Sequence, residues 1–121
     1  MKFLKTIALS IMLFCASSSL AEAVEVGDTI VFVKPFNFGT ITQQDYEAMR
    51  AFLEKENKDA LTRMILNNRI IDIKKDWVAD VVDEGYYGKY YGYQIIMANG
   101  PYQNVKFYVS QTTMNKTIVK K

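Results

Sequence analysis

Between Arg69 and Val109, mainly apolar residues alternate with other residues at a period of two. Successive side chains of a strand point to opposite faces, so this period predicts strands with one buried face. The residues expected to face inward are Ile71 and Ile73, then Trp77, Ala79 and Val81, then Tyr91, Tyr93, Ile95 and Met97, and last Val105, Phe107 and Val109. Turns are predicted at Lys74-Lys75-Asp76 and at Asn99-Gly100-Pro101. The second half of the chain is therefore expected to form four short strands.

Two helices are predicted between residues 42 and 68. Thr42 followed by Asp45 resembles a capping box at the start of the first helix. The polar run 54–59 is expected to break the helical segment, and Asn67-Asn68 to end it, because asparagine tolerates the left-handed conformation common there. Apolar residues at helical spacing are Tyr46, Met49, Phe52 and Leu53 on the first helix, and Ala60, Leu61, Met64 and Ile65 on the second.

A further strand is predicted at residues 29–33, where β-branched and aromatic residues precede Lys34-Pro35. Residues 36–39 are expected to form a loop, and the tail from Gln111 to be polar and frayed. The expected fold class is α+β and β-dominated. It is a small antiparallel barrel or curved sheet, with a helical segment inserted after the first strand.

Residues 1–23 have the features of a secretory signal peptide. Lys2 and Lys5 precede an apolar run at residues 7–14, which is about half of the roughly 20 residues that span a bilayer. Ala21-Glu22-Ala23 has the small-x-small form of a cleavage site, and cleavage is expected after Ala23 or, alternatively, after Ala21. We therefore expect a periplasmic or secreted protein with no stable membrane span after cleavage.

Cleavage would remove Cys15, the only cysteine, and would leave residues 24–121 as one small domain with a polar C-terminal tail. As an alternative, Cys15 could be the acylated residue of a lipoprotein, but Phe14 stands where a small residue is required. Histidine is absent from the whole chain. Without cysteine and histidine, the usual zinc, copper and iron sites and the Ser–His and Cys–His nucleophiles are excluded. We expect no metal, no cofactor and no catalytic residue.

The charge of the chain argues against nucleic acid as a partner. Of 15 basic and 13 acidic residues, cleavage removes Lys2, Lys5 and Glu22, which leaves a net charge of about +1. A nucleic-acid surface would need clustered basic residues.

In the order of its elements, the sequence resembles the small SH3-like barrels of exported bacterial proteins. A leader, an entry strand, a helical region, a strand that ends at Met97 and the closing strand Phe107-Tyr108-Val109 carry this resemblance. It departs from the pattern where Asp76 replaces a turn glycine, and where no Gly-Trp pair precedes Val109. The resemblance implies a binding or regulatory module for a peptide, a cell-wall fragment or another protein, and it implies no catalytic residues.

The run 85–93 holds five of the eight tyrosines and three glycines. Tyrosine offers a large contact area with few torsions to order, and such residues are common at binding surfaces. The period of two places Tyr91 and Tyr93 inside, so Tyr86, Tyr87 and Tyr90 are the candidates for an exposed ligand-binding loop. The alternative is a twisted hairpin whose tyrosines only pack on the sheet.

Three further aromatic residues are candidate ligand contacts. Trp77 is the only tryptophan, and either packs mainly in the core or anchors a ligand. Phe36 and Phe38 flank Asn37, and either form an exposed patch or attach the helix to the sheet.

The densest carboxylates are candidates for a hydrolytic site, because paired acids can cleave glycosides. They are Asp72, Asp76, Asp80, Asp83 and Glu84. Asp72 and Asp80 fall on outward strand positions, which favours solvated charges over catalysis.

The leading hypothesis is a non-catalytic exported module that binds a protein, a peptide or an envelope component. The alternative is a small exported inhibitor or immunity protein directed against a lysozyme or a toxin. The sequence does not determine the oligomeric state.

Overall fold

The computed structural model describes the backbone of residues 24–120 and the side chains as far as Asn115. The predicted leader lies outside the described residues, and with it Cys15 and the two expected cleavage sites.

The fold is α+β and strand-rich, as predicted. Six strands from β2 to β7 form an antiparallel sheet, and the short β8 adds a seventh strand beside β2, in the order β4-β3-β7-β6-β5-β2-β8. The strands are β2 (Thr29–Phe32), β3 (Asn37–Thr40), β4 (Ile71–Ile73), β5 (Val78–Tyr87), β6 (Tyr90–Met97), β7 (Lys106–Ser110) and β8 (Ile118–Lys120). The helices are α1 (Gln43–Glu54), α2 (Lys58–Leu66) and α3 (Gln111–Thr117).

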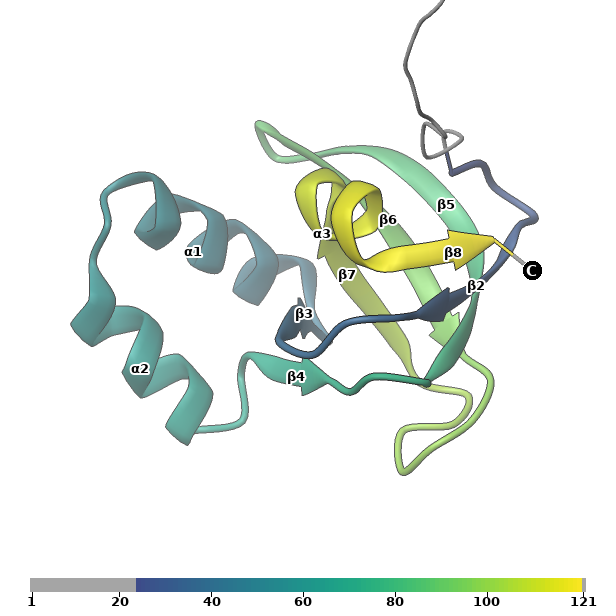
Figure 1. The fold of residues 1–121 in the computed structure, drawn as a ribbon. Coiled ribbons are helices and arrows are strands. Elements are labelled where there is room, and N and C mark those ends of the chain that lie inside the picture. The colour runs from purple at the N-terminus through teal and green to yellow at the C-terminus, as the bar shows by residue number, and fades with distance from the viewer. Residues whose placement is uncertain (1–23, 121) are drawn as a thin grey trace, which may run out of the picture.

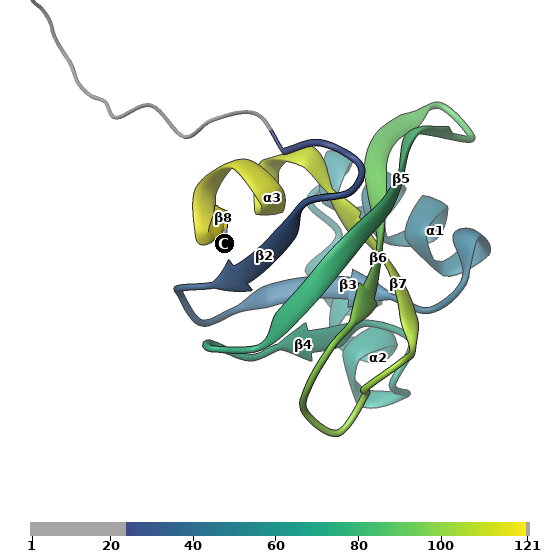
Figure 2. The same ribbon diagram turned by 90° about the vertical axis from the view of Figure 1, so that its right-hand side faces the viewer.

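The sheet is open, so the expectation of a closed barrel is wrong. A barrel requires the two edge strands to pair with each other. Here β4 pairs with β3 and β8 pairs with β2, at opposite ends of the strand order. Figures 1 and 2 show that the strands curve strongly without closing. The alternative of a curved sheet therefore describes the structure.

The segment expected to be a loop at residues 36–39 is largely strand β3. Asn37 is fully buried, and its side-chain amide donates to the carbonyl oxygens of Lys34 at 2.6 Å and Ile73 at 3.0 Å. Gly39 fits between Ile73 and Val109, where an added Cβ would lie 3.1 Å from each side chain. Both residues look like turn formers in the sequence. As a result α1 and α2 follow β3 and not the first strand directly.

The two predicted helices are confirmed with their ends. The Thr42 hydroxyl accepts a hydrogen bond from the backbone N–H of Asp45 at 3.1 Å, which caps α1. Asn57 caps α2 in the same way, through the N–H of Ala60. Asn68 adopts a φ of 59° after α2, the left-handed conformation expected of it.

The tail beyond Ser110 is not frayed, contrary to expectation. It forms α3, and the following residues pair with β2 as β8. Met114 is 1% exposed within the main apolar cluster, so one apolar residue attaches this otherwise polar helix to the core. The Ser110 hydroxyl accepts from the N–H of Thr113 at 3.2 Å and begins the first turn.

Two apolar clusters lie on opposite faces of the sheet. Strand β7 shows this alternation, because Phe107 and Val109 belong to the first cluster and Tyr108 to the second. The first cluster includes Val24, Ile30, Phe32, Ile73, Val81, Tyr93, Ile95, Met97 and Met114. The second lies between the sheet and helices α1 and α2, and consists of Tyr46, Met49, Met64, Ile70, Tyr87, Tyr90 and Tyr108. Figure 1 shows both helices on one side of the strands.

Candidate functional site

The β5–β6 hairpin carries the tyrosine-rich run and extends beyond the rest of the sheet (Figures 1 and 2). Its turn is formed by Gly88 and Lys89, with Gly88 at a φ of 65°. A bulge between Val81 and Asp83 shifts the phase of β5 by one residue. Because of this shift, Tyr86 lies opposite Tyr91 in the hairpin.

One face of the hairpin presents the most exposed tyrosine. Tyr86 is 73% exposed, and its ring meets the Tyr91 ring edge to face at 5.2 Å between centroids. The Tyr91 hydroxyl donates to the Glu84 carboxylate at 2.5 Å, and this bond is the main reason that the pKa of Tyr91 rises to about 12. Tyr93 continues the row and is buried. The rings beneath Tyr86 are therefore fixed before any partner binds.

Tyr87 and Tyr90 are buried, so the expectation that they are exposed is wrong. They are 7% and 8% exposed, because α1 covers the face of the hairpin that alternation assigns to them. The Tyr87 ring meets Tyr46 and Tyr108 edge to face, at 5.9 Å and 5.0 Å. Burial, together with a hydrogen bond from its hydroxyl to Asp83, raises the pKa of Tyr87.

Gly92 allows α1 to approach the hairpin. An added Cβ at this residue would lie 2.7 Å from the carbonyl oxygen of Val109 and closer still to the Tyr46 hydroxyl. That hydroxyl donates to the carbonyl oxygen of Tyr91 at 2.7 Å. Burial raises the pKa of Tyr46, and the neighbouring Arg50 opposes this shift.

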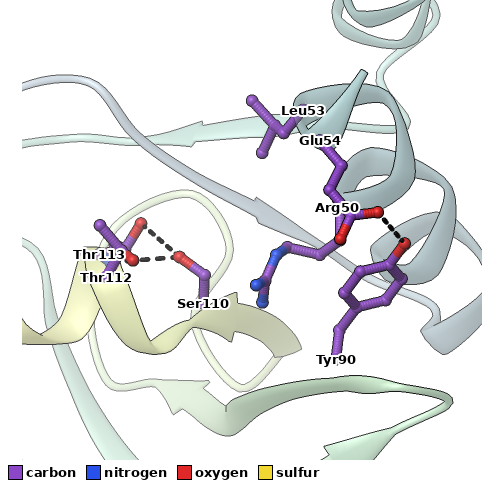
Figure 3. A pocket seen from close by; sticks show the side chains of 7 residues that line it. All are labelled: Arg50, Leu53, Glu54, Tyr90, Ser110, Thr112 and Thr113. Carbon is purple, nitrogen blue, oxygen red and sulfur yellow. Dashed lines mark hydrogen bonds between the residues drawn. The ribbon is translucent and has the colours of Figure 1, made fainter. Parts of the chain in front are cut away.

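Arg50 extends from α1 into a pocket between α1, β6 and the β7–α3 junction (Figure 3). Its Nη1 donates to the Tyr46 hydroxyl at 2.6 Å and to the carbonyl oxygen of Tyr91 at 3.0 Å. The guanidinium carbon lies 5.1 Å from the centroid of the Tyr90 ring. The pocket has a volume of about 390 Å³ and is lined by Arg50, Leu53, Glu54, Tyr90, Ser110, Thr112 and Thr113.

The pocket contains two opposite charges that do not pair with each other. Among residues 24–115, whose side chains the structure describes, the ion pairs are Arg69 with Asp45 and Lys74 with Asp72, so Arg50 and Glu54 form none with these residues. Glu54 instead accepts a hydrogen bond from the Tyr90 hydroxyl at 3.2 Å. The Tyr90 ring therefore contacts both charged groups, with the guanidinium over its face and the carboxylate at its hydroxyl.

The other candidate aromatic residues lie away from this pocket. Trp77 is half-buried, with its ring 6.2 Å from that of Tyr102 and against the backbone of Gly100. Trp77 packs at the edge of the first apolar cluster, which agrees with the first of its two interpretations. Phe36 is 73% exposed and Phe38 37%, so neither attaches the helix to the sheet through burial.

The structure does not bring the candidate acids together. Asp72 is on β4, whereas Asp80 and Glu84 are on β5, and three strands lie between β4 and β5 in the sheet. Each has its own neighbour: Lys74 contacts Asp72, Thr29 donates to Asp80, and Tyr91 donates to Glu84. Asp76 adopts a φ of 75°, the conformation of the turn glycine that it replaces.

Among residues 24–120, no group of three or more acidic side chains is arranged to hold a metal ion. Helices long and apolar enough to cross a membrane are also absent from this described part of the chain. No protein-family model, curated protein or solved structure matches the chain significantly. The site must therefore be interpreted from its own residues.

Sequence reasoning missed the pocket. It singled out Tyr90, but not Arg50, Glu54 or the hydroxyl groups around Ser110. Two signals were available: Arg50 and Glu54 are four residues apart on one helix face, and Gly92 interrupts a predicted strand. Neither signal identifies α3 as the opposite wall, because that tail was expected to be frayed.

Proposed function

We propose that this chain is an exported, non-catalytic binding module that recognises a protein, a peptide or an envelope component through the end of the β5–β6 hairpin. The observation that carries the proposal is the exposure of Tyr86, at 73%, on a row of fixed tyrosine rings. Large exposed aromatic side chains on a rigid base are typical binding residues, because little conformational entropy is lost when they are covered.

The structure changes the basis of this proposal. The open sheet lacks the barrel of the SH3-like domains that the sequence resembles, and therefore also the ligand groove of such a barrel. The projecting hairpin and its turn, formed by Gly88 and Lys89, take its place.

The test is a capture experiment with the protein expressed from the full sequence and tagged at its C-terminus. Tyr86→Ala should reduce capture of the partner from envelope extract by at least tenfold, the loss typical of an aromatic hot spot. Tyr87 and Tyr90 are unsuitable for this purpose, because their burial makes them part of the core.

Leu66→Ala is the matched control, because Leu66 is 75% exposed on α2. It should leave capture unchanged. Equal capture by wild type and Tyr86→Ala would contradict the proposal. N-terminal sequencing of the purified protein tests export independently: a start at Val24 supports cleavage of the leader, and a start at Met1 contradicts it.

An enzyme as the captured partner would favour the inhibitor or immunity alternative. An envelope component or a structural protein would favour the general module.

A further inference from the structure

We propose that the pocket around Arg50 binds a small zwitterion of the amino-acid or dipeptide class, with its carboxylate at Arg50 and its ammonium at Glu54. This site is separate from the exposed end of the hairpin and does not rest on the function proposed for Tyr86. Its volume of about 390 Å³ lies within the range of small-molecule sites.

The Arg50 guanidinium is the group that would bind the carboxylate of the ligand. Arg50 makes two side-chain hydrogen bonds to described residues, and both come from Nη1. One is to the Tyr46 hydroxyl and the other is to the carbonyl oxygen of Tyr91. Among the described residues, Nε and Nη2 have no partner, and no carboxylate neutralises the charge. A guanidinium held in place with free donors binds a carboxylate strongly, because the bonds are charge-assisted.

The hydroxyl groups of Ser110, Thr112 and Thr113 line the wall across from α1 (Figure 3). Hydroxyl groups can donate to a carboxylate and carry no charge of their own. Ser110 and Thr113 also bond to each other at 3.1 Å, which orients them within the wall.

The Glu54 carboxylate is the group that would bind the ammonium of the ligand. This carboxylate faces the same pocket as Arg50 and would repel a ligand that carried only negative charge. It uses Oε1 to accept from Tyr90, so Oε2 remains able to accept from a cation. A ligand with both charges satisfies both side chains. The exposed Leu53 and the Tyr90 ring offer apolar contact to its carbon atoms.

The test uses alanyl-leucine, N-acetyl-alanyl-leucine and alanyl-leucine amide as probes of the full-length protein. Binding is followed by NMR chemical shifts of the backbone N–H groups of residues 110–113 and the Nε–H of Arg50. The free dipeptide should give saturable shifts. The amide and the N-acetyl form should each bind at least tenfold more weakly, because each loses one charge-assisted bond.

Glu54→Gln separates ligand recognition from folding, because glutamine keeps an oxygen that can accept from Tyr90. In this variant the N-acetyl form should bind as well as the free dipeptide. Glu56→Gln, outside the pocket on the same polar segment, should keep the wild-type preference.

Arg50→Lys retains the positive charge and tests binding of the ligand's carboxylate. It should weaken binding of the free dipeptide at least tenfold. Three results would overturn the proposal: no saturable shift at millimolar dipeptide, equal binding of the amide, or an unchanged preference for the free amine in Glu54→Gln.

Discussion

The hydroxyl of Tyr46 on α1 donates a 2.7 Å hydrogen bond to the backbone carbonyl oxygen of Tyr91 on β6. The bond joins the first helix to the hairpin beside Gly92, where an added Cβ would collide with the Tyr46 side chain. Gly92, the neighbour of Tyr91, leaves the space that the phenol occupies. Arg50 donates to both oxygen atoms, so the same contact fixes the guanidinium of the pocket.

Gly92→Ala should lower the free energy of unfolding by about 1–3 kcal/mol, the usual cost of overpacking a core. The added methyl group would collide with the Tyr46 hydroxyl and approach the carbonyl oxygen of Val109 to 2.7 Å. Urea denaturation measures the change. Tyr46→Phe removes the shortest of these contacts, the one with the hydroxyl oxygen, so the double variant should lose less than the sum of the single losses. Additive losses would contradict this account of the contact.

Folding stability should fall as the pH rises from about 10 to about 12. The pKa of Tyr91 is raised to about 12, first by its hydrogen bond to Glu84, whereas an unfolded tyrosine titrates near 10. A group whose pKa is higher in the folded state stabilises that state fully below pH 10 and loses this contribution as it deprotonates. Burial raises the pKa of Tyr46, Tyr87 and Tyr93 in the same direction.

Urea midpoints at pH 8, 10 and 11.5 measure this dependence. Tyr91→Phe should make the decline between pH 10 and 11.5 less steep than in wild type. Leu66→Ala is the control, because Leu66 is exposed on α2 and carries no titratable group, and it should leave the slope unchanged. A wild-type midpoint that stays constant up to pH 11.5 would contradict the prediction.

Phe36→Gly should raise the thermal midpoint. Phe36 has a φ of 66°, which costs a residue with a Cβ about 1–2 kcal/mol, whereas glycine adopts it freely. The side chain is 73% exposed, so its removal loses little apolar burial. Glycine also increases the conformational entropy of the unfolded chain, which offsets part of this effect. The free energy of unfolding should therefore rise by up to about 1 kcal/mol.

Calorimetry of Phe36→Gly and Phe38→Gly provides the comparison. Phe38 is a strand residue of β3 paired with Asp72, so glycine there should lower the midpoint. A lower midpoint for Phe36→Gly would mean that the aromatic ring contributes more to folding than its backbone strain costs.

Much of the local structure could be predicted from the sequence. The ends of α1 and α2 follow from Thr42 and Asn68, whose side chains or backbone preferences act within a few residues. The buried alternation at Ile71 and Ile73 and at Tyr93, Ile95 and Met97 follows from the period of two. These patterns are local, because each residue needs only its near neighbours to adopt the observed conformation.

Local patterns could not predict that residues 37–40 form a strand or that the C-terminal tail forms helix α3. Asn37 and Gly39 favour turns by composition, and become strand residues only because Ile73 and Val109 pack against them from distant parts of the chain. Met114 is one apolar residue in a polar helix, and its burial depends on the position of the first cluster.

Local sequence patterns are sufficient to predict helices α1 and α2 and the main strands, and the composition alone excludes histidine and any thiol other than Cys15. Which tyrosines are exposed depends on tertiary packing. Period two divides them between two faces of the hairpin, but solvent reaches a face only where no helix covers it. Packing of α1 buries Tyr87 and Tyr90, leaves Tyr86 exposed and brings Arg50 to the pocket. These contacts join residues about 40 positions apart in the chain, such as Arg50 and Tyr90, so they cannot be predicted from a local sequence pattern.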